Sequence, residues 1–326
     1  MKVQLMNKIS QAGLGVFDKS YTYGEAVENP DALLVRSAKL HEMAFEPELA
    51  CIARAGAGVN NIPIDRCSQE GIVVFNTPGA NANAVKELAL AAMLLASRDI
   101  VGGIEYAKTL AGTEGVAKTV EANKSRFAGY ELAGKTLLVI GLGAIGGPLA
   151  NMAVQLGMHV IGYDPYVSVN AAWNINSRVR HGEKLPECLA EADYISLHIP
   201  LTKDTKGFLG KEEFEAMKPG CRVLNLSRGE IVDNEAMLAA IKAGKVAKYV
   251  TDFPDETMVG QEGVIAIPHL GASTEESEDN CAGMAAKELI DYIENGNIVN
   301  SVNLPEIVMP RSGESRICVI HKNIPN

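Results

Sequence analysis

Three side chains in the second half of the chain each follow a short apolar run. In parallel sheets, catalytic groups commonly lie at this position, just after the carboxyl end of a strand. Arg228 follows RVLNLS, Glu256 follows YVTDF and His269 follows GVIAIP. Because the carboxyl ends of parallel strands meet at one edge of a sheet, we expect a guanidinium, a carboxylate and an imidazole to meet there. Taken singly, Arg228 also fits a solvated strand end, Glu256 a loop carboxylate and His269 a core histidine. Together they predict a site that binds a carboxylic acid and transfers a proton.

A glycine motif for dinucleotide binding precedes these residues. GLGAIG contains Gly141, Gly143 and Gly146 and lies between the apolar run 136–141 and a helix-like stretch, and Asp164 ends the next apolar run. The first glycine suits a tight turn, the second a close approach of pyrophosphate to the backbone, and the third close packing of helix on strand. A purely structural glycine turn is the alternative. Asp164 has no Lys or Arg beside it, which favours NAD over NADP.

The elements that position these groups alternate between strand-like and helix-like segments. Strand patterns cover 136–141, 159–164, 193–200, 222–227, 249–253 and 263–268, and helix patterns cover 144–157 and 234–244. This alternation implies right-handed crossovers and a parallel sheet covered on both faces. We therefore predict an α/β fold with a doubly wound Rossmann-type domain.

The first 80 or so residues indicate a second, smaller α/β domain of flavodoxin-like type. Its strand patterns lie in 31–37, 47–58 and 71–79, and helix patterns at 85–100 and 274–296 lie on either side of the larger domain. We expect a discontinuous substrate domain at 1–83 and 272–303, an inserted NAD-binding domain at 84–271, and a linker with a domain stub at 304–326.

Composition excludes several classes of function. A formal charge of −10 argues against a general grip on nucleic acid. The sequence has no run of about 18 apolar residues for a membrane span and no leader-like segment, so we expect a soluble, cytoplasmic protein. Six scattered cysteines without metal-ligand spacing predict neither disulfides nor a metal site, and we expect them to be buried thiols.

The motifs together resemble the D-isomer-specific 2-hydroxyacid dehydrogenases over about residues 30–305. The segments that carry the resemblance, in order, are RAGAGVNNI, NTPGANANAVKEL, GLGAIG, YDP, LHIPLT, NLSRG, TDFPDE and PHLGAST. The family pattern D-V-F-x-x-E-P is here DFPDET, which is one residue shorter and lacks the final proline. The position of Glu256 is therefore less firmly fixed than those of Arg228 and His269.

The resemblance implies roles for individual residues. Arg228, Glu256 and His269 are then the catalytic residues, with Glu256 orienting the imidazole. Asp164 binds the adenosine ribose, and Asp252 lies on the nicotinamide side. The resemblance also implies a substrate-binding set of Arg54, Ala55, Gly56, Arg228 and His269, and a cofactor-binding set of Thr77, Gly141, Gly143, Ala144, Ile145, Gly146, Asp164, His198, Ile199, Pro200, Leu226, Ser227, Asp252 and Gly271.

The substrate implied by the resemblance is a small 2-hydroxy acid, and we expect it to be phosphorylated, as D-3-phosphoglycerate is. Arg54, between glycines that expose backbone N–H groups, is the expected phosphate ligand, with Arg36 and Lys39 as helpers or as ordinary surface charge. An unphosphorylated acid such as D-lactate or D-glycerate is the main alternative. An NAD-sensing transcriptional corepressor with the same fold is a remote one.

Two further expectations concern assembly and the end of the sequence. We expect a homodimer. The segment SRICVIHKNIPN at 315–326 resembles the opening strand of the ACT regulatory domain, which needs several more elements than twelve residues supply. Regulation through such a domain is therefore not expected of this polypeptide.

Overall fold

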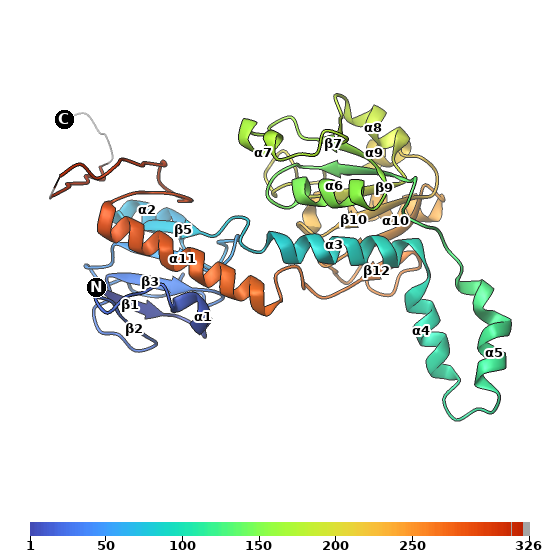
Figure 1. Cartoon of the computed structure of the whole chain (residues 1–326), viewed down its shortest axis with the longest axis horizontal. Coiled ribbons are helices and arrows are strands. Elements are labelled where there is room, and N and C mark those ends of the chain that lie inside the picture. The colour runs from blue at the N-terminus through green and yellow to red at the C-terminus, as the bar shows by residue number, and fades with distance from the viewer. Residues whose placement is uncertain (314, 322–326) are drawn as a thin grey trace. The chain divides into compact units, whose positions relative to one another are not determined.

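The computed structural model describes residues 1–313 and 315–321. The chain forms two compact units, Met1–Ala82 with Ala272–Asn326 and Asn83–Gly271. Each unit contains one sheet, all of whose paired strands are parallel, with helices packed on it (Figure 1). The predicted α/β class, with a Rossmann-type domain, is confirmed.

The first unit has a five-stranded sheet with the order β2-β1-β3-β4-β5. This is the flavodoxin-like order. Its strands are β1 (Lys2–Leu5), β2 (Thr22–Gly24), β3 (Ala32–Val35), β4 (Cys51–Arg54) and β5 (Val73–Asn76). Its helices are α1 (Gln11–Leu14), α2 (Ile64–Glu70) and α11 (Glu275–Asn295).

Successive side chains along the strands of the first unit point to opposite faces of the sheet, and each face has its own hydrophobic core. Leu34 and Ala53 point to the face covered by α1 and α11, whereas Leu33 and Ile52 point to the face covered by α2. All four are fully buried, as expected for central strands of a parallel sheet. Helix α11 therefore belongs with the N-terminal strands although it lies some 200 residues after them.

The second unit has a seven-stranded sheet with the order β12-β11-β10-β9-β6-β7-β8, which is the doubly wound arrangement. Its strands are β6 (Thr136–Ile140), β7 (His159–Tyr163), β8 (Arg180–His181), β9 (Tyr194–Leu197), β10 (Cys221–Asn225), β11 (Val246–Thr251) and β12 (Val264–Ala266). Its helices are α3 (Ala82–Ser97), α4 (Ile100–Thr109), α5 (Val116–Asn123), α6 (Gly146–Gln155), α7 (Val169–Trp173), α8 (Leu185–Glu191), α9 (Lys211–Ala216) and α10 (Asn234–Lys242), with 3-10 turns at Lys124–Phe127 and Gly229–Ile231.

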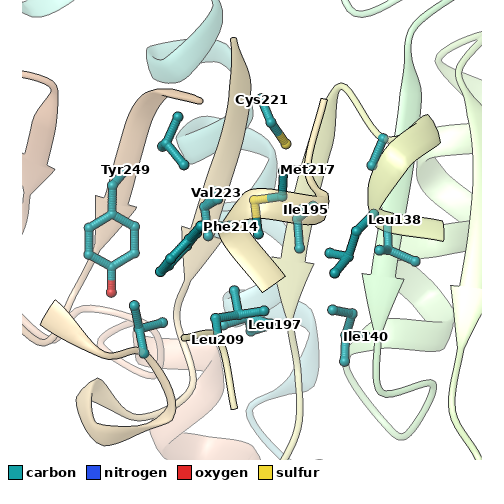
Figure 2. Close-up of a cluster of buried hydrophobic side chains, with 14 of the residues drawn as sticks. Leu138, Ile140, Ile195, Leu197, Leu209, Phe214, Met217, Cys221, Val223 and Tyr249 are labelled. Atoms are coloured by element: carbon teal, nitrogen blue, oxygen red, sulfur yellow. The ribbon is translucent and has the colours of Figure 1, made fainter. Parts of the chain in front are cut away.

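The core of the second unit is also split between the two faces of its sheet. Figure 2 shows one face, where Ile140, Leu197 and Val223 from three strands meet Phe214 of α9 and Met217 just beyond it. The other face packs against α3 and α6. Burial on both faces explains why these strands are continuous apolar runs in the sequence. Because the strands are parallel, the carboxyl ends of β6, β7, β9, β10 and β11 lie at one edge of the sheet.

Helices α4 and α5 differ from the other long helices of the second unit because none of their residues is buried. They carry exposed large apolar side chains nevertheless, at Ile100, Val101, Ile104, Val116 and Val120. We call residues 100–127 the helical arm. No element was predicted for residues 101–127.

The segment after α11 runs along the open edge of the first sheet. Ser301 pairs with Phe75 of the edge strand in an antiparallel bridge, and the N–H of Val302 donates to the carbonyl of Val74. Residues 315–321 form no strand, so the expected opening strand of a further domain is not found there. Residues 314 and 322–326 of the expected stub lie outside the described residues.

The structure bears on two expectations drawn from composition, the burial of the cysteines and the lack of a membrane-spanning helix or metal site. Five cysteines are buried free thiols as expected, but Cys318 is exposed, so that expectation is wrong for it. Within 1–313 and 315–321, no helix is long and apolar enough to cross a bilayer, and no cluster of potential metal ligands occurs.

Candidate functional site

The glycine loop of the second unit has the geometry that each of its glycines requires. Gly141 follows β6 with a φ of +90°, and a Cβ there would lie 2.4 Å from the carbonyl oxygen of His198. A Cβ at Gly146, the first residue of α6, would lie 1.9 Å from the carbonyl oxygen of Gly141. A Cβ at Gly143 would meet no atom within 4 Å, so its outer side is open to a ligand. Ala144 and Ile145 complete the turn into α6.

Asp164 lies just beyond β7 and is tied to this loop. One carboxylate oxygen accepts a hydrogen bond from the N–H of Leu142 at 2.8 Å, and the other accepts from the N–H of Tyr166 at 2.9 Å. A carboxylate has about four acceptor positions, so two remain available for hydroxyl groups. The half-buried side chain thus fixes the loop and can still bind a ribose.

Arg228 follows β10 and is held by its own neighbours. Asn225, fully buried at the end of β10, donates from its side-chain amide to the carbonyl of Arg228 at 2.8 Å. The guanidinium of Arg228 donates to the carbonyl of Ser227 at 2.7 Å, and the hydroxyl of Ser227 donates to the carbonyl of Leu197. The turn after β10 is therefore anchored to β9, and the half-buried Arg228 keeps further donors for an anion.

Phe253 lies between Arg228 and His269. Its ring centroid is 4.4 Å from that of the imidazole, and the carbon at the centre of the guanidinium lies 5.7 Å from the same Phe253 ring. His269 is otherwise exposed. The structure thus brings the predicted guanidinium and imidazole together around an aromatic ring.

Asp252 is the acidic residue that the structure associates with this pair. It is 1% exposed, and neither of its carboxylate oxygens has a hydrogen-bond partner of good geometry in the described part of the chain. Burial raises the pKa of the Asp252 carboxyl, while the nearby His269 and Arg228 act in the opposite direction. A buried acceptor of this kind is costly unless a ligand satisfies it.

Glu256 is not brought against His269. It is exposed, and it has no hydrogen bond or ion pair with any of the described residues. The turn that contains it is organised by Asp255, whose carboxylate accepts from the N–H groups of Thr257 and Met258 and from the side chain of Asn234. The shortened segment gives Glu256 no comparable anchor.

The backbone carbonyl of His198 lies against Gly141 of the glycine loop, whereas its side chain adds no charge to the site near pH 7. Its Nε2 lies 2.8 Å from the hydroxyl of Ser196, and its buried Nδ1 has no partner among the described residues. Burial lowers the pKa of His198 to about 4, so the ring is neutral near pH 7. The remaining predicted cofactor residues of this unit surround the same edge: Ile199 and Pro200 follow β9, Leu226 is buried after β10, and Gly271 is buried at the end of the unit.

The first unit has a second candidate ligand loop immediately after β4. Gly56 has a φ of +147°, and a Cβ there would lie 1.9 Å from the guanidinium of Arg54. The carbonyl of Gly56 accepts from the N–H of buried Thr77 at 3.2 Å, and the carbonyl of Ala57 accepts from the side-chain amide of Asn76 at 2.6 Å. The N–H groups of Ala57 and Gly58 donate to no other group within the described part of the chain. Two such N–H groups beside an arginine suit an anion.

A cavity of about 520 Å³ borders this loop on the side of Arg54. Its lining is basic and polar, consisting of Arg36, Ser37, Lys39, His41, Arg54, Asn60 and Asn61. Arg36 is also paired with Glu278 at 2.6 Å, which offsets part of its charge. Both predicted helpers therefore line the cavity, and His41 is an addition that the sequence analysis missed.

The residues present fit a bound dinucleotide. The open side of Gly143 and the start of α6 suit a pyrophosphate, and Asp164 has spare acceptors for a ribose. The unsatisfied oxygens of Asp252 suit an amide donor such as a nicotinamide carboxamide. The side chains and backbone groups of the second unit therefore fit NAD, the predicted cofactor.

Two functional residues of the second unit were missed in the sequence. Asn225 interrupts the apolar run VLNLS in the sequence, and the structure shows that its side chain is fully buried. A polar residue inside an apolar run indicates a buried hydrogen bond, so this signal could have been found in the sequence. Phe253 gave no signal, because its contact with His269 depends on the ends of two paired strands meeting, which no sequence pattern encodes.

Comparison with known proteins agrees with this arrangement. Residues 90–271 match the family described as D-isomer specific 2-hydroxyacid dehydrogenase, NAD binding domain. D-3-phosphoglycerate dehydrogenase of Archaeoglobus fulgidus is 39% identical over 284 residues, which are 85% of this chain and 50% of the relative. D-3-phosphoglycerate dehydrogenase 1 of Saccharomyces cerevisiae is 30% identical over 365 aligned positions, covering 100% of this chain and 75% of the relative.

Solved structures show the same similarity. The NAD⁺-bound 3-phosphoglycerate dehydrogenase of Entamoeba histolytica superimposes with a TM-score of 0.71 at 27% identity, covering 93% of this chain and 99% of that one. D-2-hydroxyisocaproate dehydrogenase, at 21% identity and a TM-score of 0.74, shares the fold. The chain spans about half the length of most of the curated relatives it matches.

Proposed function

Because this chain belongs to the D-isomer specific 2-hydroxyacid dehydrogenase family, we propose that it oxidises D-3-phosphoglycerate to 3-phosphohydroxypyruvate with NAD. This reaction is the first step of phosphorylated L-serine biosynthesis. Bound NAD supplies the hydride acceptor. The observation that selects a phosphorylated substrate is the basic cavity beside the 54–58 loop.

The charge of that cavity matches a substrate with two anionic ends. Arg36, Lys39 and Arg54 bring three cationic side chains to its lining, and Arg36 is paired with Glu278. The exposed N–H groups of Ala57 and Gly58 add directional donors that a phosphate or carboxylate oxygen can accept. An unphosphorylated acid such as D-lactate has only one anionic group, so it matches a cavity lined by three cationic side chains less well.

The second unit is proposed to carry out the chemistry. Arg228 binds the substrate carboxylate, for which its planar fork is suited. His269 accepts the hydroxyl proton as hydride leaves the substrate carbon, and returns it in the reverse reaction. Glu256 is retained as the proposed partner of His269 on family resemblance, although it requires a movement of its exposed turn.

Asp252 provides an alternative source of negative charge for the imidazole. It is buried near both His269 and Arg228, and it already attracts both electrostatically. A nicotinamide carboxamide held near Asp252 would donate to this carboxylate and favour its ionised form. We therefore assign Asp252 to the cofactor, with a secondary effect on the charge of His269.

We also propose that the protein is a homodimer in the cytoplasm. The helical arm carries five exposed large apolar side chains on helices without any buried residue, which suits burial against a second copy. All six cysteines are free thiols, the state that a reducing compartment maintains. Light scattering on the purified protein tests the first point, and a dilution-independent monomer mass contradicts it.

The experiment that tests the proposed reaction compares substrates in one preparation. NADH formation is followed by absorbance with 3-phosphoglycerate, D-lactate and D-glycerate, for the wild type and for Arg54→Ala. We expect a marked preference of the wild type for 3-phosphoglycerate and a loss of roughly 2–5 kcal/mol in transition-state stabilisation for that substrate in Arg54→Ala. Equal turnover of D-lactate, or an equal loss on all substrates, assigns the protein to an unphosphorylated acid instead.

A further inference from the structure

Helix α11 contains a buried carboxylate that the proposed chemistry does not use. Glu288 is 8% exposed, and its Oε1 accepts a hydrogen bond from the side-chain amide of Asn300 at 2.8 Å. Its Oε2 has no partner among the described residues. A carboxylate buried in this way with one oxygen unpaired destabilises the fold. Such a residue is a candidate for a functional role.

Asn300 transmits the position of Glu288 to the edge strand of the first sheet. It has a φ of +59°, one of two positive values at non-glycine residues of the described chain. In this conformation its side chain donates to Glu288 while its carbonyl accepts from the N–H of Asn76 at 3.3 Å. Removal of the Glu288 acceptor therefore removes one of the contacts that hold Asn300 in this left-handed conformation.

Asn76 and Thr77 in turn orient two peptide groups of the 54–58 loop. The side chain of Asn76 donates to the carbonyl of Ala57, and the N–H of Thr77 donates to the carbonyl of Gly56. In a trans peptide the N–H points opposite to the carbonyl of the same group, and the structure has no cis peptide bond. Fixing these two carbonyls therefore aims the N–H groups of Ala57 and Gly58 in the opposite direction, away from Asn76 and Thr77.

We propose that Glu288 is a positioning residue for substrate binding, which acts through Asn300 and Asn76 to aim the N–H groups of Ala57 and Gly58 at an anionic group of the substrate. The identity of that substrate rests on the proposed function above, but the network itself does not. All of its members belong to the first unit.

The test uses two variants that cut the network and two that do not. Glu288→Ala removes the acceptor, and Asn300→Gly removes the donor while permitting the same backbone conformation. Glu288→Gln keeps an acceptor oxygen for Asn300. Tyr21→Phe is the matched control, because it deletes a 2.7 Å hydrogen bond from Tyr21 to Glu294 on the same helix, outside the network.

Steady-state kinetics separate positioning from a general loss of structure. We expect Glu288→Ala and Asn300→Gly to raise KM for 3-phosphoglycerate roughly tenfold, equivalent to about 1.4 kcal/mol, with kcat within about twofold of the wild type. Glu288→Gln and Tyr21→Phe should leave KM within about twofold. An unchanged KM in Glu288→Ala, or an equal rise in Tyr21→Phe, overturns the proposal.

Amide hydrogen exchange of the protein without substrate decides the same point independently of the reaction. Exchange at the amides of Asn76 and Thr77 should accelerate at least about tenfold in Glu288→Ala and Asn300→Gly but not in Glu288→Gln. If the wild type fails to oxidise 3-phosphoglycerate while these exchange rates change as expected, the proposed function fails and the network stands. If exchange is unchanged in both cutting variants, the network is refuted whatever the substrate.

Discussion

Replacement of Glu288 by glutamine should stabilise the protein, and the gain should grow as pH rises. Burial raises the pKa of Glu288 from 4.5 to about 7, against which the hydrogen bond from Asn300 acts only in part. The folded state therefore holds a proton that the unfolded state releases, and stability falls as pH rises from about 4.5 through about 7. Glutamine carries no charge and avoids this loss.

The expected size follows from that shift. A rise from 4.5 to about 7 corresponds to about 3 kcal/mol at 1.36 kcal/mol per pKa unit, which is an upper value because the residue retains some contact with solvent. We expect the difference in free energy of unfolding between Glu288→Gln and the wild type to increase by roughly 2–3 kcal/mol between pH 5 and pH 8.

Urea denaturation followed by circular dichroism measures this difference. Glu48→Gln, which removes an exposed carboxylate from the same unit, is the control and should show little change with pH. A difference between Glu288→Gln and the wild type that is constant across this range, or that grows toward acid pH, would show that the pKa of Glu288 is not raised in the folded state.

Three other predictions concern the dinucleotide side and the helical arm. His269→Ala should lower kcat by roughly 10²–10⁴ with little change in the dissociation constant of NAD, as measured by fluorescence titration, and near-normal turnover would assign the proton transfer to another group. NAD should be preferred over NADP by at least about tenfold in kcat/KM, about 1.4 kcal/mol, because the Asp164 carboxylate repels a 2′-phosphate; equal use would remove that explanation. Ile104→Lys with Val120→Lys should convert the protein to monomers by light scattering, and an unchanged mass would exclude the arm as the dimer contact.

The features that the sequence predicted are those whose physical cause is local. Gly141, Gly146 and Asp164 lie within one strand–turn–helix–strand segment, so their spacing alone fixes their geometry. Continuous apolar runs likewise located the buried strand β10, which ends before Arg228, and the partly buried strand β12, which ends before His269. The short strand patterns of the first unit predicted a smaller α/β domain, but the order of its strands came only from the structure.

The features that the sequence did not predict depend on contacts between distant segments. Phe253 contacts His269 only because two neighbouring strands end together, and no periodicity encodes that contact. Glu288 has the sequence context of an ordinary charged helix residue, and its burial follows from the packing of α11 against the N-terminal strands. The role of Glu256 depended on a motif that is one residue short, and its exposed turn is set by Asp255 instead.

The proposed reaction of this chain is the oxidation of a phosphorylated D-2-hydroxy acid with NAD. The most direct measurement is kcat/KM for 3-phosphoglycerate and for D-lactate, determined by NADH absorbance on the same wild-type preparation. The basic cavity lined by Arg36, Lys39 and Arg54 predicts that 3-phosphoglycerate is preferred by at least about 100-fold, or about 2.7 kcal/mol. Equal values for the two substrates, or a preference for D-lactate, would show that the substrate is not a phosphorylated acid.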